Sequence, residues 1–140
     1  PQIDQFAEAG ADLISLHAEN GNAAEGLDRI ASHGLKAGMV LRVETPVTRA
    51  APWLPRLDAL TLLGTAIGVK GQGLDPAAGD RLREAKTLIG DRPVLLCADG
   101  GIRDNTVPLL RQAGAETVVL GSLAFGAPDL AARMDWLRSL

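Results

Sequence analysis

Short apolar runs separated by helical patterns constrain the fold of this chain more than any other feature. Strands that alternate with helices pair in parallel, and a run that is apolar throughout is typical of a strand covered on both faces. The runs lie at residues 13–16, 37–43, 59–63, 93–98 and 117–120. Helices are expected at residues 23–32, 46–54, 75–89, 105–113 and 128–140, with a helix end at 3–9 and Thr45 as an N-cap. The sequence therefore predicts an α/β fold with five parallel strands.

Three helix-to-strand junctions share one pattern, in which a glycine follows the helix and an apolar strand follows the glycine. They lie at residues 9–12, 33–36 and 113–116. A glycine in the left-handed conformation is a common helix end, and every such loop in a (β/α) barrel makes the same tight turn. A closed barrel has eight strands and about 250 residues, or about 30 per βα unit. We therefore expect one domain over residues 1–140 that forms part of a TIM barrel and lacks three βα units.

The composition excludes several classes of partner. Aromatic residues make up 3% of the chain, tyrosine is absent and the formal charge is −3, which argues against a nucleic-acid surface. No apolar run approaches the roughly 20 residues of a membrane span. A single cysteine, Cys97, fits a reducing compartment, so a cytoplasmic location is expected. Of the two histidines, His33 follows a helix C-terminus and is predicted to be structural or solvated.

Two neighbouring strands are followed by residues suited to phosphate and proton chemistry. Asp99, Gly100 and Gly101 come directly after the run 93–98, and Gly121 and Ser122 follow the next run. A carboxylate at the C-terminal mouth of a barrel strand can be a metal ligand or a general acid/base. Backbone N–H groups at glycine turns and short helices bind phosphate there. The alternative is that both segments are ordinary turns.

Two further segments are candidates for the same end of the barrel. His17 follows the run 13–16, so it is predicted to lie at the mouth with Asp99. Two ligands are too few for a catalytic zinc, which usually has three from the protein. Gly68, Lys70 and Gly71 lie in a glycine-rich loop that could surround a phosphate. The alternatives are a hydrogen-bonded polar residue at a strand end and a flexible connection.

These motifs resemble the ribulose-phosphate 3-epimerase family over essentially the whole chain. The resemblance rests on segments 98–102, 113–115 and 121–125, on 9–12 leading to His17-Ala18-Glu19, and on Gly38 with Thr45-Pro46. It implies a TIM barrel of the ribulose-phosphate-binding type, of which residues 1–140 form the C-terminal five βα units and lack the first three. It also implies an isomerase that epimerises a pentulose phosphate at C3 through an enediolate.

The resemblance also implies roles for individual residues. The family holds a divalent metal, usually zinc, by two histidines and two aspartates, and His17 and Asp99 match two of these ligands. Asp99 would also be one of the two carboxylates that exchange the C3 proton. Gly100, Gly101, Gly121 and Ser122 would bind the phosphate. The expected partner is a small phosphorylated sugar, and a homo-oligomer is expected.

The chain departs from the family pattern in two ways. The other two metal ligands lie in a His-x-Asp pattern on an earlier strand, and residues 1–140 contain no such pattern. The family's Gly-Phe-Gly-Gly loop is replaced by Gly68-Val69-Lys70-Gly71. The lysine predicts a divergent branch that acts on a related ketose or pentulose phosphate.

Two alternative functions stay open at this point. The chain could belong to another phosphate-binding barrel enzyme, such as an aldolase, decarboxylase or synthase, which would need no metal at His17. It could also be a truncated barrel that survives as a non-catalytic binding or assembly module, because five strands with an open edge favour a partner chain.

Overall fold

A computed structural model of the chain describes residues 2–69 and 72–140. Its centre is a parallel five-stranded sheet in the order β1-β2-β3-β4-β5, so each strand pairs with the next one along the chain. The strands are β1 (Leu13–His17), β2 (Lys36–Leu41), β3 (Ala59–Leu63), β4 (Leu95–Asp99) and β5 (Thr117–Val118). The predicted α/β class and the five parallel strands are confirmed.

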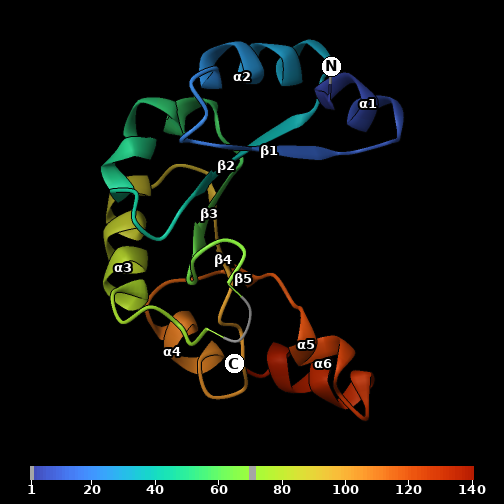
Figure 1. Cartoon of the computed structure of the whole chain (residues 1–140), viewed down its shortest axis with the longest axis vertical. Helices are drawn as coiled ribbons and strands as arrows, with labels where there is room; N and C mark the ends of the chain where they lie inside the picture. The colour runs from blue at the N-terminus through green and yellow to red at the C-terminus, as the bar shows by residue number, and fades with distance from the viewer. Residues whose placement is uncertain (1, 70–71) are drawn as a thin grey trace.

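Helices cover the outer side of this sheet. In Figure 1, α2, η1, α3 and α4 follow the outer side of the curved row of strands, with α1 beside α2 at one end and α5 with α6 at the other. Their bounds are α1 (Gln2–Glu8), α2 (Ala23–Ser32), the 3₁₀ helix η1 (Val47–Arg56), α3 (Ala78–Ile89), α4 (Val107–Gln112), α5 (Ser122–Phe125) and α6 (Leu130–Arg138). Within the described residues, no helix is long and apolar enough to cross a membrane.

The hydrophobic core lies between the helices and the outer face of the sheet. Leu27 and Ile30 form the buried stripe of α2, and Met39, Leu41 and Leu60 meet them from the strands, each at most 1% exposed. Burying one such side chain stabilises the fold by about 1.5–3 kcal/mol. The helical stripe predicted for residues 23–32 is confirmed.

The inner face of the sheet is not covered in the same way. Leu13 of β1, Leu95 of β4 and Val119 after β5 are 39%, 46% and 47% exposed. The expectation that both faces are buried is therefore wrong for the described part of the chain, because its helices form one layer on one side. An apolar face of this kind fits the interior of a barrel that these strands do not close.

Some element ends differ from the sequence prediction. Thr45 does not cap a helix: η1 begins at Val47 after Pro46, without a side-chain cap, and the Thr45 hydroxyl donates to Glu19 instead. The helix is of the 3₁₀ type and contains Pro52 and Pro55, which lack the N–H groups that a regular α-helix uses. The strands β2 and β5 end two residues early, and α3 begins at Ala78 after a turn rather than at residue 75.

Candidate functional site

The strand register places His17 and Asp99 on the same face of the sheet. His17 is opposite Val40, Val40 is opposite Thr61, and Thr61 is opposite Cys97. Asp99 lies two residues beyond Cys97, and residues two apart in a strand share a face. Both side chains are therefore on the inner face, at the C-terminal edge. They are separated by three strand spacings of about 4.8 Å each.

Asp99 is held at the start of a turn that has little room. Gly100 and Gly101 have φ values of +84° and +69°, a region that other L-residues rarely adopt. A Cβ atom on Gly101 would lie 3.0 Å from the Leu74 Cα atom, and one on Gly100 would lie 2.5 Å from the Thr65 Oγ1 atom. The backbone of the Asp-Gly-Gly turn therefore packs directly against the loop that follows β3.

A pocket of about 230 Å³ opens at this turn. It brings Asp99, Gly100 and Gly101 together with Gly121 and Ser122, as the sequence predicts. Asp99 is the one carboxylate on its described walls, and Arg103 is the one cation. The remaining lining residues are Thr65, Val69, Gln72, Ile102 and Val119. This arrangement offers a proton-transfer group beside donors for an anion.

Sequence reasoning missed Arg103, although it lies two residues after the Asp-Gly-Gly motif. Its guanidinium donates weakly to the Gln72 carbonyl at 3.4 Å, and its backbone N–H donates to the Thr106 Oγ1 atom at 2.8 Å. Thr106 in turn donates to the Gly101 carbonyl at 2.6 Å. Arg103 is exposed, so the guanidinium is accessible to a ligand anion. A basic residue directly after a phosphate-type turn was the available signal.

The loop that follows β3 contributes to the pocket only in part. Val69 and Gln72 line it, and Gly68, at φ +79°, has open space around its Cα and is not among the lining residues. Lys70 and Gly71, which the sequence predicts as ligand contacts, lie outside the described residues. The proposed contacts of these three residues stay predictions.

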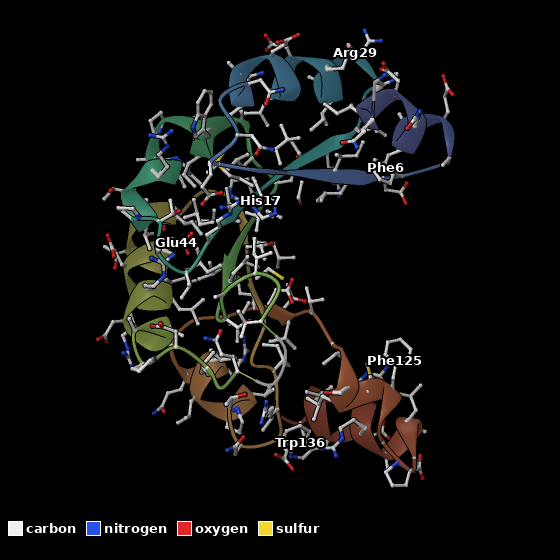
Figure 2. All side chains as sticks on the ribbon, in the orientation of Figure 1. Phe6, His17, Arg29, Glu44, Phe125 and Trp136 are labelled. Atoms are coloured by element: carbon white, nitrogen blue, oxygen red, sulfur yellow. The ribbon has the colours of Figure 1, made fainter. Side chains whose placement is uncertain are left out.

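His17 is not a lining residue of this pocket. Figure 2 shows it on the inner side of the curve formed by the strands, far from Phe125 of α5. Its Nδ1 atom lies 3.5 Å from the Glu19 Oε2 atom, and both atoms are buried without a hydrogen-bond partner among the residues that the structure describes. The other Glu19 oxygen, Oε1, accepts from the Arg42 N–H at 2.8 Å and from the Thr45 hydroxyl at 2.5 Å.

Glu19 is ionised more readily than an ordinary glutamate. Burial alone would raise its pKa, but the hydrogen bonds from Thr45 and from the Arg42 N–H outweigh burial and hold the pKa below its usual range. His17 therefore has a carboxylate beside its Nδ1 atom. Cys97, deeper on the inner face, differs: burial raises the pKa of its thiol, as does nearby Asp99, so the thiol stays protonated at neutral pH.

The described residues do not by themselves form a metal site. They contain no group of three or more His, Cys, Asp or Glu side chains placed to hold a metal. The His17 Nδ1 atom lies near the Glu19 carboxylate without a hydrogen bond between them, and 36% of the His17 side chain is exposed. Histidines that bind metals usually donate their second ring N–H to such a group. His17 and Asp99 lie on one face of the sheet but three strands apart, so their roles as metal ligands stay predictions.

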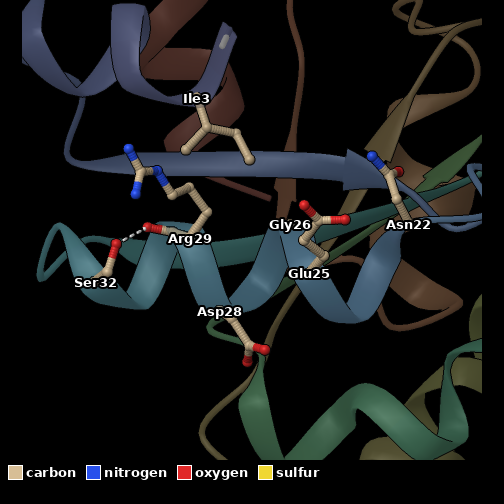
Figure 3. A pocket seen from close by; sticks show the side chains of 7 residues that line it. All are labelled: Ile3, Asn22, Glu25, Gly26, Asp28, Arg29 and Ser32. Carbon is tan, nitrogen blue, oxygen red and sulfur yellow. Dashed lines mark hydrogen bonds between the residues drawn. The ribbon is translucent and has the colours of Figure 1, made fainter.

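A larger cavity of about 470 Å³ lies away from this edge, on α1 and α2 (Figure 3). Its wall includes Arg29, whose Nε atom donates to Asp4 at 2.6 Å. Asp4 also contacts the His33 Nε2 atom at 2.7 Å, so His33 is structural, as predicted. The side-chain hydrogen bonds from Arg29 and His33 hold the pKa of Asp4 far below its usual range. This cluster ties α1 to α2 and does not form a reactive site.

Comparisons with known proteins give one consistent family. A model of the "Ribulose-phosphate 3 epimerase family" matches residues 1–125. "Ribulose-phosphate 3-epimerase 2" of Cupriavidus necator is 41% identical over 137 residues, which are 91% of this chain and 56% of that protein. "Ribulose-phosphate 3-epimerase" of Escherichia coli K12 is 34% identical over 143 residues, covering 98% of this chain and 62% of the relative. The chain thus spans about three fifths of the length of these relatives.

Solved structures confirm the fold. A 3-hexulose-6-phosphate synthase aligns with a TM-score of 0.72 at 24% identity, over 99% of this chain and 66% of the other. The synthase from Salmonella typhimurium aligns with a TM-score of 0.74 at 19% identity, over 99% and 65%. At these identities the likeness concerns the fold alone, and it agrees with five consecutive units of a TIM barrel.

Proposed function

Because this chain belongs to the ribulose-phosphate 3-epimerase family, we propose that it forms the part of an epimerase that binds a pentulose phosphate and exchanges its C3 proton on one face. The observation that carries this proposal is the pocket in which Asp99 lies beside two glycine turns and the Arg103 guanidinium. The reaction is an isomerisation, and the substrate is a ketose or pentulose phosphate, for which ribulose 5-phosphate is the test compound.

The phosphate would bind to backbone N–H groups of the two turns. Gly100 and Gly101 follow β4, and Gly121 and Ser122 lie at the start of α5. Arg103 adds a positive charge at the same pocket, and a charge-assisted hydrogen bond contributes about 1.5–3 kcal/mol. From the sequence we add contacts from Gly68, Lys70 and Gly71. Lys70 would select a ketose phosphate related to the family's usual substrate.

Asp99 would act as the general base for the C3 proton. Removal of that proton leaves the electron pair shared with the neighbouring carbonyl, as an enediolate, and return of a proton to C3 completes exchange. Epimerisation needs a second acid on the opposite face of the carbon. Asp99 is the one carboxylate on the described wall of the pocket, so we expect residues 1–140 alone to exchange the proton without efficiently inverting C3.

A divalent metal, zinc by family resemblance, would stabilise negative charge on the substrate oxygens when bound. His17 and Asp99 are the residues of this chain that would hold it. The common inner face of the two residues and the carboxylate beside His17 support this assignment. A cytoplasmic location and a homo-oligomer stay predictions from the sequence.

The test is exchange of the C3 hydrogen in deuterated water. The chain is incubated with ribulose 5-phosphate and zinc, and the C3 proton signal is followed by NMR. General acid–base groups contribute about 10²–10⁴-fold, so Asp99→Asn should slow exchange by at least about 100-fold. The control is Asp104→Asn, which removes an exposed carboxylate outside the pocket lining.

The outcomes separate the proposal from its rivals. Exchange that is present in the wild type and in the control, and lost in Asp99→Asn, supports it. Exchange at the wild-type rate in Asp99→Asn would show that another group is the base. A wild-type chain that neither binds nor exchanges the sugar phosphate would favour a non-catalytic barrel module.

A further inference from the structure

A second cavity, of about 290 Å³, adjoins the pocket that contains Asp99. The two share Ile102, Arg103 and Ser122 as walls. We call the second one the outer cavity, because its remaining described walls come from the turn after β4 and from the α5–α6 region, which lies at one end of the structure (Figure 1). Those walls are Asp104, Leu123, Gly126, Ala127 and Arg133.

The outer cavity lies on the phosphate side of the proposed site and not on the side of the reacting carbon. Asp99, Thr65 and Val119 line the first pocket, and none of them is a described wall of the outer cavity. A sugar phosphate would place its carbon chain toward Asp99 and its phosphate at the two glycine turns. The outer cavity would therefore receive a group attached to the phosphate, beyond the sugar.

Two arginines give this cavity its binding chemistry. Arg103 lies between the two cavities, and Arg133 reaches the outer one from α6. Among the ion pairs within the described ranges, none includes either guanidinium. The side chain of Arg103 makes one long hydrogen bond there, at 3.4 Å to the Gln72 carbonyl. Both planar groups therefore keep N–H donors for an anion, and their geometry matches a phosphoryl group.

Arg133 is held in position without being neutralised. The central carbon of its guanidinium lies 5.3 Å from the centre of the Trp136 ring, a distance at which the ring face attracts the cation. Figure 2 labels Trp136 in the α6 region. At the start of this helix, the Asp129 side chain accepts from the Ala132 N–H at 3.0 Å and the Asp129 carbonyl accepts from the Arg133 N–H at 3.2 Å. The cation thus stands on an anchored helix beside the cavity.

One carboxylate opposes the two arginines. Asp104 is a wall of the outer cavity, and its Oδ1 atom accepts from the Asn105 N–H at 2.9 Å. The charged groups on the described walls are thus two cations and one anion, which leaves a net positive charge. An anion bound there would be attracted by Arg103 and Arg133 and repelled by Asp104. Substitutions at the two kinds of wall should therefore change its affinity in opposite directions.

We propose that the outer cavity is a second anion subsite, which binds the outer phosphoryl group of a diphosphate whose inner phosphoryl group occupies the first pocket. Arg103 would contact both phosphoryl groups, and Arg133 would contact the outer one alone. The proposal rests on the proposed phosphate site at the two glycine turns. It adds diphosphate esters to the class of ligands that the chain binds. A free phosphate ion offers the same chemistry, so the test uses both anions.

The first experiment is calorimetric titration of the 140-residue chain with sodium pyrophosphate and, separately, with sodium phosphate. Pyrophosphate should bind at least about tenfold more tightly than phosphate, as expected for one further charge-assisted contact. Arg133→Gln should weaken pyrophosphate binding by about tenfold and leave phosphate binding unchanged. Asp104→Asn should strengthen pyrophosphate binding. The matched control is Arg138→Gln, on the same helix, which removes an exposed ion pair with Asp135 and should leave both affinities unchanged.

Trp136 provides a second measurement that reports on the outer cavity itself. The chain has two tryptophans, so Trp53→Phe leaves Trp136 as the fluorescent one. An anion that draws Arg133 toward the cavity changes the cation over the ring, and pyrophosphate should therefore change the emission of Trp136. Phosphate should not change it at concentrations that fill the first pocket. A change with phosphate at the same concentrations would identify a free anion as the occupant and would overturn the diphosphate.

The remaining outcomes decide the proposal even if one variant fails to fold. Equal affinities of the wild type for pyrophosphate and phosphate would overturn it, and so would a folded Arg133→Gln chain that keeps the preference for pyrophosphate. A wild-type chain that binds neither anion would overturn both the subsite and the phosphate site. If the preference depends on Arg133 while Asp99→Asn leaves C3 exchange unchanged, the subsite stands and the proposed catalytic role of Asp99 falls.

Discussion

Replacing Gly101 by alanine tests whether the turn after Asp99 is limited by close packing. The backbone at Gly101 has a φ of +69°, and an added Cβ would lie 3.0 Å from the Leu74 Cα atom. The left-handed conformation costs an ordinary residue about 1–2 kcal/mol. Moving a packed backbone aside costs about 1–3 kcal/mol more. Gly101→Ala should therefore lower the free energy of unfolding by about 2–5 kcal/mol.

Gly34→Ala is a matched control for this change. Gly34 has the same φ of +69°, but a Cβ there would have no atom within 4 Å. It should therefore cost only the conformational part, about 1–2 kcal/mol. Urea unfolding of both variants measures the difference, and titration of ribulose 5-phosphate should show weaker binding for Gly101→Ala alone. Equal losses of stability in the two variants would refute the argument that contact with Leu74 restricts the turn.

Three further predictions concern the phosphate pocket and the acid stability of the fold. Gly121→Asp should weaken binding of ribulose 5-phosphate in a ³¹P NMR titration, because the added negative charge repels the phosphate. Its thermal stability should change little, because Gly121 has a φ of −107° and open space for a Cβ. An unchanged affinity would remove Gly121 from the phosphate site. Arg103→Ala should weaken the same binding by about tenfold or more, as expected for loss of one charge-assisted hydrogen bond, and the remaining binding should depend less on salt. The hydrogen bonds from Arg29 and His33 lower the pKa of Asp4 in the folded chain. Ionised Asp4 therefore stabilises the fold above the ordinary aspartate pKa of about 3.9. This stabilisation is lost as the pH falls toward the lowered pKa of the folded chain. Urea unfolding between about pH 2 and 6 should show a shallower acid decline for Asp4→Asn, and identical pH profiles would contradict this origin.

Local patterns were sufficient to predict those parts of the fold that depend on neighbouring residues. The helix Ala23–Ser32 follows from its apolar stripe of Ala23, Leu27 and Ile30. The left-handed glycine at its end, Gly34, has the expected positive φ. Asp99 with Gly100 and Gly101 is a contiguous motif, so its place at a strand end could be read from the sequence.

Contacts between distant residues account for what local patterns missed. Thr45 before Pro46 has the pattern of a helix start, yet its hydroxyl is used by Glu19, 26 residues earlier in the chain. Nothing within a helical turn of Thr45 reveals that competition. Arg103 was overlooked for a related reason, since its place in the pocket depends on the loop containing Gln72, 31 residues away.

The strand register links the two ends of the candidate site. The Ala18 N–H donates to the Val40 carbonyl at 2.9 Å, which extends the β1–β2 pairing and brings Glu19 beside the Arg42 N–H. A slip of one residue would turn His17 to the helix-covered face and would separate Glu19 from the donors that hold it. The hydrogen bonds that align β1 with β2 therefore also decide on which face of the sheet the His17 imidazole lies. Substitutions in this strand pair should affect His17 through register even where they do not contact it.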